Sequence, residues 1–216
     1  MIKEVEIFTS QTLPISYSVF GRRTNKNRRV EYLIDPKGLL DKGYGIPEQV
    51  VLSRWKKKSS RKNYCSGMRM SPNIWRSIRV ALGNDAFSIA QMSIEEINAC
   101  YHRKSDELKA HKYPIITGEK ILHLARGLGS KNLEALLLRH NDMSRSGLFG
   151  TPDLYLWKST KKTRDIHSIK FVEVKKPKEP LSSDQRDELE YLNNVLGIPA
   201  LLLRLIEHKM TQRLNL

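Results

Sequence analysis

The sequence predicts an α/β protein in which helices flank a mixed β-sheet and a helical part precedes it. Two observations carry this prediction. Residues 147–205 are predicted, in order, as strand, loop, strand, helix and strand. The residues before them contain several segments whose apolar side chains recur at helical spacing. With 216 residues, of which 39% are hydrophobic, the chain suits one domain, or a core with one helical addition.

Helices are expected ahead of these strands wherever apolar residues recur three and four positions apart. They cover 47–55, pieces of 71–106, 117–126 and 130–140. Gly127 and Gly129 separate the last two helices, since glycine commonly ends a helix. A short strand is also expected near the N-terminus, in the stretch IKEVEIF.

The two central strands are predicted over 153–158 and 169–175, because large and β-branched side chains alternate along both. A basic loop over 159–168 joins them, so an antiparallel pair is the simplest arrangement. That pairing brings Asp153, at the start of one strand, near Glu173, at the end of the other. A helix over 182–197 and a buried strand over 199–206 follow.

Two carboxylates and a lysine at one sheet edge have a chemical use. Glu173 and Lys175 are two residues apart on a strand, so their side chains project the same way. Hard cations such as Mg²⁺ prefer carboxylate and carbonyl oxygens, which makes Asp153, Glu173 and the Val174 carbonyl a candidate metal site. A metal held there polarises a phosphate and lowers the pKa of a bound water. Lys175 orients that water or offsets charge in the transition state.

The order Pro-Asp, then Glu-x-Lys, at Asp153, Glu173 and Lys175 resembles the PD-(D/E)xK nucleases. A finer pattern resembles the virus-type replication-repair nuclease domain (VRR-NUC), and most of all its Fanconi-associated nuclease branch. That pattern is Gly-x-Pro-Asp, a hairpin, Phe-Val-Glu-Val-Lys-x-Pro, and Leu-Ser-x-x-Gln before a leucine-bearing helix. The good match covers about 133–205, a third of the chain.

The resemblance implies a restriction-endonuclease-like fold and metal-dependent hydrolysis of DNA phosphodiester bonds. Asp153, Glu173 and the Val174 carbonyl would bind Mg²⁺ or Mn²⁺, and Lys175 would position the attacking water. The implied substrate is branched or flapped DNA in replication and repair, which allows repair-protein partners. On this basis residues 111–216 form the nuclease domain and residues 1–110 a basic, mostly helical N-terminal region.

Gln185 has two interpretations. In the family pattern it sits near the site, where its side chain hydrogen-bonds water or phosphate. Ser182-x-x-Gln185 is also a capping box at the start of the predicted helix, which needs no function.

The charge of the chain favours a polyanionic partner, with nucleic acid ahead of membrane. Lys and Arg number 38 against 23 Asp and Glu, a formal net charge of +15. The basic residues nearest the site in sequence are candidates to hold the DNA backbone: Lys161, Lys162, Arg164 and Lys176. Two other basic blocks, 21–29 and 56–63, are phosphate contacts or solvated surface, and the first is alternatively a localisation signal.

Other site classes find little support. Cys65 and Cys100 form no CxxC pair, and neither His123 nor His140 has partners at ligand spacing, so a zinc site is not predicted. The two cysteines also make no disulfide framework. No signal peptide or long apolar run is present, from which an intracellular location is expected: the nucleus if the source is eukaryotic, otherwise the cytoplasm.

One expected residue has no recognisable motif. Related nucleases usually carry a further glutamate on an upstream helix; Glu48, Glu119 and Glu134 lie on predicted helices, but none stands in matching context. One-metal and two-metal chemistry therefore both stay open, as does a second function, a weak or inactive DNA-binding module of the same fold. A third interpretation makes Glu173 and Lys175 a surface ion pair, but it explains neither Asp153 nor the helix that follows.

Overall fold

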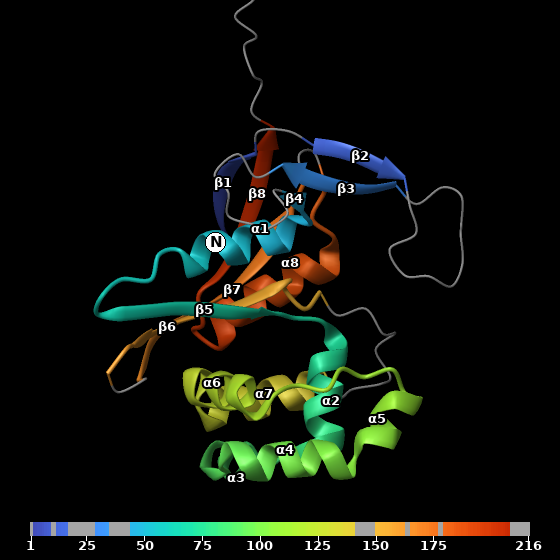
Figure 1. Cartoon of the computed structure of the whole chain (residues 1–216), viewed down its shortest axis with the longest axis vertical. Helices are drawn as coiled ribbons and strands as arrows, with labels where there is room; N and C mark the ends of the chain where they lie inside the picture. Colours follow the sequence, from blue (N-terminus) through green and yellow to red (C-terminus); the bar gives the residue numbers. More distant parts are fainter. Residues whose placement is uncertain are drawn as a thin grey trace, which may run out of the picture.

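The computed structural model describes residues 2–9, 12–16, 29–34, 44–140, 150–162, 165–176 and 179–207. Its centre is a five-stranded mixed sheet in the order β1-β8-β7-β6-β5 (Figure 1). The pairs β1–β8 and β8–β7 are parallel, whereas β7–β6 and β6–β5 are antiparallel. The strands are β1 Lys3–Thr9, β5 Asn63–Arg69, β6 Leu154–Thr160, β7 Ile166–Lys175 and β8 Ala200–Glu207. This is the restriction-endonuclease-like mixed sheet flanked by helices that the sequence predicted.

A smaller antiparallel sheet has the order β2-β3-β4. Its strands are β2 Thr12–Ser16, β3 Arg29–Ile34 and β4 Tyr44–Gly45. Most of the first basic block, 21–29, lies outside the described residues. In the described part of the chain, no helix is long and apolar enough to cross a membrane.

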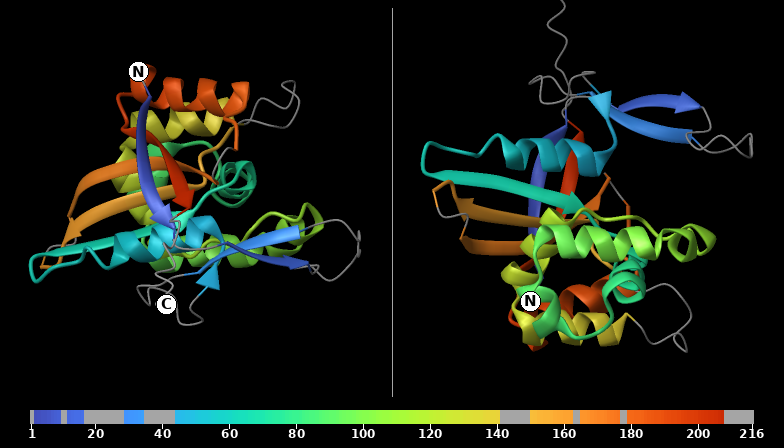
Figure 2. Two further views of the ribbon diagram at one scale, coloured as in Figure 1. Left: turned by 90° about the horizontal axis from the view of Figure 1, so that it is seen from above. Right: turned by 60° about the horizontal axis from the view of Figure 1, so that its bottom comes forward.

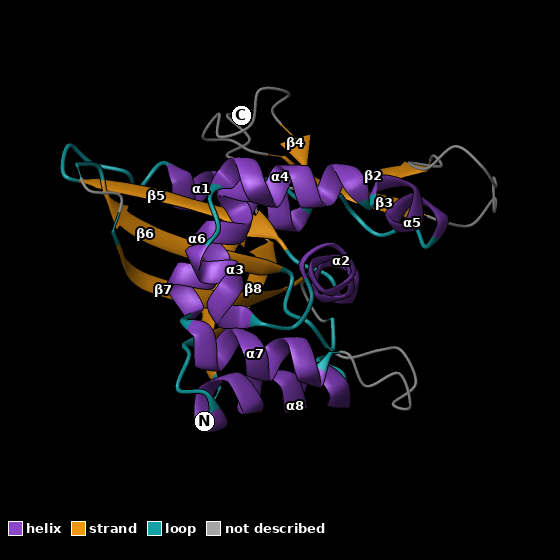
Figure 3. Cartoon of the chain, turned by 90° about the horizontal axis from the view of Figure 1, so that it is seen from below, coloured by secondary structure: helices purple, strands orange, loops and turns teal. Residues whose placement is uncertain are grey.

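The helices divide unequally between the two faces of the large sheet. Helix α1 (Pro47–Lys56) covers one face, and the others gather mainly on the opposite face (Figures 2 and 3). They are α2 Pro72–Leu82, α3 Ala86–Gln91, α4 Ile94–Arg103, α5 Ser105–Ala110, α6 Gly118–Leu128, α7 Ser130–Arg139 and α8 Ser183–Glu190, with a π-helical turn Tyr191–Val195 after α8.

Alternation along β6 creates the two cores that hold these layers together. Leu154 and Leu156 point to α1 and pack with Val50 and Val51 in the smaller core. Tyr155 and Trp157, which alternate with them on β6, point to the opposite face and join the larger core beneath α2–α8. Burial of such side chains contributes roughly 1.5–3 kcal/mol each, so the sheet is stabilised from both sides.

The hairpin of β6 and β7 is longer than predicted. Pairing continues past 158 to Ser159↔Ile166, with a register shift after Lys158, so the loop is shorter than 159–168. Gly129, with φ of 73°, ends α6 as expected. Gly127 does not break the helix. It lies inside α6, where a Cβ would collide with the hydroxyl of Tyr155 on β6, so glycine is needed for close packing of this helix on the sheet.

Strands from distant parts of the chain meet in this sheet. The predicted N-terminal strand is β1, which pairs with β8 from the other end of the sequence. Strand β5 forms the opposite edge, beside β6. The sheet therefore takes strands from both sides of residue 110, where the sequence suggested a division, and it carries the candidate site between β5 and β8.

Candidate active site

The candidate site lies where β6 begins and β7 ends. Asp153 immediately precedes β6, and its Oδ2 accepts a hydrogen bond of 2.8 Å from the backbone N–H of Val174. Its carbonyl accepts a bond of 2.7 Å from the N–H of Met70, which follows β5. Backbone donors from both neighbouring strands thus fix Asp153 beside Glu173, as the antiparallel pairing predicted.

The backbone carbonyl of Val174 is directed toward the side of β7 on which Asp153 lies. The N–H of Phe171 donates to the carbonyl of Pro199, on the β8 side. The peptide groups of the residues that alternate with Phe171 along β7 therefore face β6. Val174 belongs to that second set, since its N–H points at Asp153. In a strand, the N–H and C=O of one residue point to the same neighbour, and opposite Val174 the neighbouring strand β6 has not yet begun. The carbonyl is therefore directed toward the side on which the Asp153 carboxylate lies.

Gln185 forms the predicted capping box and also lies at the site, where it contacts Glu173, while a contact with water or phosphate stays a prediction. Its Oε1 accepts from the Ser182 N–H at 3.1 Å, and the Ser182 hydroxyl accepts from the Gln185 N–H at 3.2 Å, so the capping box is present. The remaining end of the same amide, Nε2, donates to Oε1 of Glu173 at 2.5 Å. The start of α8 thereby orients the glutamate of β7.

Gly150 lets the chain approach this point. A Cβ at Gly150 would overlap the backbone of Asp184 and Gln185 at the start of α8. The segment that leads to Asp153 therefore runs directly against α8, which brings Asp153 and Gln185 onto the same site.

Lys175 is held between two glutamates. Its Nζ lies 3.2 Å from Oε1 of Glu173 and 3.3 Å from Oε1 of Glu179. Both Glu173 and Lys175 are buried, with 1% and 5% of their surfaces exposed, so the surface ion-pair interpretation is wrong. Burial alone lowers the pKa of Lys175, but the two carboxylates outweigh it, and the pKa lies above its usual value.

Glu179 is a site residue that the sequence analysis did not propose. Besides contacting Lys175, its Oε2 accepts from the N–H of Lys176 at 3.1 Å, and its carbonyl accepts from Arg204 of β8 at 2.8 Å. The only sequence signal was its position four residues after Lys175. In an extended or turning segment that spacing predicts no contact, because four-residue spacing brings side chains together only on a helix.

Glu48, in the first turn of α1, is the upstream glutamate that lies near this site. Its carboxylate is close enough to raise the pKa of Asp153, and its Oε2 is buried with no hydrogen-bond partner among the described residues. The other two candidates do not serve this site. Glu119 lines a groove along β5, and Glu134 is exposed on α7.

The carboxylates resist ionisation in this setting. Burial raises the pKa of Asp153, and the charges of Glu48 and Glu179 add to the rise against the opposing effects of the Val174 N–H and Lys175. Burial also raises the pKa of Glu173, with Asp153 adding to it and Lys175 opposing it. Buried acids kept partly protonated by one another's charge are stabilised by a cation placed among them.

The donor set fits a hard divalent cation chemically. Glu48 and Glu173 each have one buried carboxylate oxygen without a hydrogen bond in the described part of the chain, and oxygens are the donors that such cations prefer. Within the same residues, no three His, Cys, Asp or Glu side chains are grouped so that they could hold a metal ion. Lys175 and Gln185 both contact Oε1 of Glu173, which leaves Oε2 as the oxygen of that carboxylate open to a cation.

The predicted DNA-contacting residues are spread over the hairpin. Lys176 directly follows Lys175 at the site. Lys161 and Lys162 lie in the turn after β6, at the other end of a seven-residue strand that spans about 23 Å. Arg164 lies outside the described residues. Nearness in sequence to Asp153 therefore did not translate into nearness in space for the first two lysines.

A mixed sheet with Pro-Asp at the start of one strand and Glu-x-Lys on the next defines the PD-(D/E)xK class of nuclease fold. Within that class, residues 91–204 match the VRR-NUC domain. This is more than half of the chain, so the chain belongs to the VRR-NUC family. The matched region begins after α1 and β5, so Glu48 lies outside it.

Comparison with solved structures gives crystal structures of paFAN1, bound to 5′-flap DNA with a gap. The structure with a 2-nucleotide flap has a TM-score of 0.48 and 13% identity, and the structure with a 1-nucleotide flap has 0.43 and 12%. Each match covers 96% of this chain and 38% of the other, so the chain spans well under half the length of paFAN1. A comparison with curated proteins found no match.

Proposed function

We propose that the protein is a metal-dependent DNA nuclease that hydrolyses phosphodiester bonds in branched or flapped DNA. The observation that carries this proposal is the buried set of Asp153, Glu173 and Lys175 at one end of the sheet. Burying charged groups is costly unless they are paired or bind metal, and a purely structural sheet edge has no need of them. Membership of the VRR-NUC family supports the nuclease activity.

The residues divide into those that hold the metal and those that act beside it. Asp153, Glu173, Glu48 and the Val174 carbonyl would hold Mg²⁺ or Mn²⁺. When bound, the ion supplies a Lewis acid for the phosphate and lowers the pKa of a coordinated water. Gln185 is a positioning residue, because it fixes the carboxylate of Glu173.

Lys175 acts on the reacting atoms in this proposal. Glu173 and Glu179 keep its pKa high, so it stays an ammonium group and donates hydrogen bonds. It orients the attacking water and offsets the charge that develops at phosphorus as the new P–O bond forms and the bond to the leaving oxygen breaks. Glu179, which touches Lys175 from the loop after β7, limits the directions in which that ammonium group can point.

The choice of branched or flapped DNA rests on two supports. The sequence pattern resembles the Fanconi-associated branch, and paFAN1, which the comparison with solved structures returned, was crystallised with 5′-flap DNA. The surplus of basic residues suits any nucleic acid. Flap preference is therefore the finer part of the proposal, and DNA hydrolysis the broader part.

A DNA-binding module without catalysis is the second candidate. One observation favours it: no three potential ligands in the described residues are grouped to hold a metal, and Lys175 contacts the glutamate that would ligate one. A binding module needs the basic surface but not the acids. Substitution of the acids therefore distinguishes the two functions, since only a nuclease would lose its activity.

The proposal is tested by cleavage of an end-labelled duplex with a 5′ flap, under single-turnover conditions with Mn²⁺ or Mg²⁺. The wild-type protein should cut, and a chelator should stop the reaction. Asp153→Asn should reduce the rate by at least about a hundredfold, the scale of losing one group that stabilises a transition state. Glu134→Gln, on the exposed side of α7, is the matched control and should cut normally. If Asp153→Asn cuts as fast as this control, the proposed site is wrong.

A further inference from the structure

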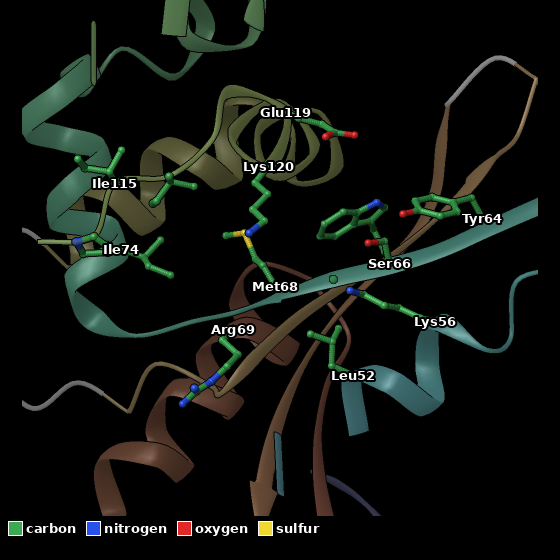
Figure 4. Close-up of a pocket in the computed structure, with 14 residues that line it drawn as sticks. Leu52, Lys56, Tyr64, Ser66, Met68, Arg69, Ile74, Ile115, Glu119 and Lys120 are labelled. Carbon is green, nitrogen blue, oxygen red and sulfur yellow. The ribbon is translucent and has the colours of Figure 1, made fainter. Parts of the chain in front are cut away.

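A groove runs along the free edge of β5, away from the acids. Its main part, about 500 Å³, lies between α1, β5 and the start of α6 (Figure 4). A smaller part of about 270 Å³ continues toward the β6–β7 turn, and Tyr64 and Glu119 line both. We call the two together the β5 groove, defined by Lys56, Tyr64, Arg69, Lys120, Trp157 and Lys161.

Four cations line this groove. Lys56 from α1 and Lys120 from α6 extend into it from opposite sides (Figure 4). Arg69 stands at one end and Lys161 at the other. Among the described residues, none of the four makes an ion pair, and Glu119 is the one acid in the lining. An uncompensated row of positive charge in a concave site indicates an extended anionic ligand.

Aromatic surface accompanies the charge. Tyr64, at the junction of the two parts, has 46% of its surface exposed, which is high for so large a ring on a strand. Trp157 also lines the main part, but it is buried in the core and its ring already stacks on His123 at 4.9 Å between centroids, so Tyr64 is the ring available to a base. Proteins that bind single-stranded nucleic acid combine a basic groove with exposed aromatic rings, because every base has a face that can stack.

The groove leads to the candidate active site. Arg69 is the last residue of β5 and pairs with Leu154. The next residue, Met70, donates its N–H to the carbonyl of Asp153. The seven residues of β5 span about 23 Å, so a chain of a few nucleotides lying along them would reach the acids at one end.

The geometry points to a single-stranded segment of the nucleic-acid substrate as the occupant, and we propose that the β5 groove holds it while the acids act on the adjoining phosphodiester. This inference rests on the proposed nuclease function and extends it. Helices wall the groove on two sides, so a duplex, whose phosphates lie on a wide convex surface, does not enter. An added peptide strand is disfavoured because Ser59 already caps part of β5, accepting from the N–H of Cys65 at 2.9 Å.

Binding is measured without cleavage, on the full chain carrying Asp153→Asn. The probe is a fluorescein-labelled oligo-deoxythymidine, followed by anisotropy in the absence of divalent metal. The double variant Lys56→Ala, Lys120→Ala removes one cation from each wall and should weaken binding by tenfold or more. Its salt slope should fall by about 1.4, at about 0.7 for each phosphate contact to a single strand. Tyr64→Leu should weaken binding about fivefold or more through lost stacking.

The matched control removes two lysines that do not line the groove, Lys109 on α5 and Lys131 on α7, as Lys109→Ala, Lys131→Ala. It should bind the oligonucleotide within about twofold of the Asp153→Asn protein, since long-range charge effects are largely screened at physiological salt. If this control loses as much affinity as the groove variant, the groove has no special part in binding and the inference fails. Circular dichroism confirms that each variant is folded.

Two further results distinguish this inference from the nuclease proposal. An oligonucleotide carrying 5-iodouracil should crosslink to Tyr64, and a crosslink that maps to another face of the protein would show that the β5 groove is not the binding site. If the wild-type protein cuts no DNA but the groove variants lose oligonucleotide binding, the nuclease proposal is wrong and the β5 groove is still supported as a binding site for a single strand. If the wild type cleaves flapped DNA and the groove variants cleave it equally fast, the groove inference is wrong and the nuclease proposal is supported.

Discussion

The side-chain amide of Gln185 donates a hydrogen bond of 2.5 Å to Oε1 of Glu173, and so the first turn of α8 orients an acid on β7. The same amide closes the capping box of α8 with Ser182. One residue therefore ties the start of a helix to the chemistry of the adjacent strand, and its two tasks are separable by substitution.

Gln185→Ala should weaken both tasks, whereas Ser182→Ala should weaken only the cap. Each variant should lose about 1 kcal/mol of stability, the usual cost of an N-cap, in chemical denaturation. Only Gln185→Ala should also slow cleavage, by about tenfold, because Glu173 loses the donor that orients it. Equal cleavage rates in the two variants would mean that Gln185 is a cap and nothing more.

Divalent metal binding should depend on Glu48 as well as on Asp153 and Glu173. Titration calorimetry with Mn²⁺ should show weaker binding for Glu48→Gln, Asp153→Ala and Glu173→Ala, since each removes a ligand from a small set. Glu134→Gln, exposed on α7, is the control and should bind as the wild type does. Undiminished binding in Glu48→Gln alone would remove that residue from the site and favour a single metal held by the other two acids.

The raised pKa values of Asp153 and Glu173 predict how stability changes with pH in metal-free protein. Burial raises both pKa values above those of the unfolded chain. At a pH between the unfolded and the folded pKa values, the folded protein therefore binds more protons than the unfolded chain does. Stability from these groups is therefore greatest below about pH 4 and is lost as pH rises through the folded pKa values.

Thermal unfolding followed from about pH 5 to about pH 8 checks this sign. Glu173→Gln cannot ionise, so the difference in stability between this variant and the wild type should grow in favour of the variant as pH rises. Saturating Mn²⁺ should reverse the trend in the wild type, because metal binding requires the deprotonated acids. If, without metal, the wild type becomes more stable relative to the variant as pH rises, the pKa values of these acids are not raised in the folded protein.

A second buried ionic cluster serves stability rather than chemistry. Glu188 on α8 accepts from Nε of Arg139 at 2.8 Å and lies 3.0 Å from Nε2 of His140, whose ring stacks on Trp75. Burial raises the pKa of Glu188, but the hydrogen bonds and charges of His140 and Arg139 outweigh it, and the pKa is lowered overall. Its contribution to stability is thus present above pH 4.5 and is lost as the pH falls below that value.

Glu188→Gln should destabilise the protein by roughly 3 kcal/mol in denaturant titration, because it leaves the largely covered guanidinium of Arg139 without its counter-charge. Glu190→Gln, exposed on the same helix, should change stability by less than about 0.5 kcal/mol. Mn²⁺ affinity should be unchanged in both. If the two variants are equally stable, the cluster around Glu188 makes no net contribution.

The local parts of the site were predictable from sequence, whereas the long-range parts were not. Alternation along β6 and β7 predicted the hairpin, and the hairpin brought Asp153 and Glu173 together. Glu48 could not be selected from the three candidates, because it lies 105 positions before Asp153 and the long-range fold decides which helix reaches the acids. Pairing of β5 beside β6, which forms the edge groove, depends on the same long-range contacts.

DNA affinity should depend steeply on salt, because basic residues that contact phosphates release counterions. Anisotropy with a flapped duplex should give a log–log slope whose size grows by about 0.9 for every phosphate contacted. Several contacts, and hence a slope of several units, are expected from a chain with a net charge of +15. A flat dependence on KCl would show that the basic surplus is not a nucleic-acid surface.

The most direct test of the central claim compares cleavage with binding in Lys175→Ala. Lys175 contacts Glu173 and Glu179 at the site, and we expect DNA affinity in the ground state to come from the many other basic residues. With Mn²⁺, single-turnover cleavage of flapped DNA should fall on the order of 10²–10³-fold, while affinity for the same DNA changes by less than about threefold. Lys131→Ala, the charge-matched control on α7, should keep both. Cleavage by Lys175→Ala at the rate of this control, in a folded protein, would contradict the assignment of Lys175 to the chemistry.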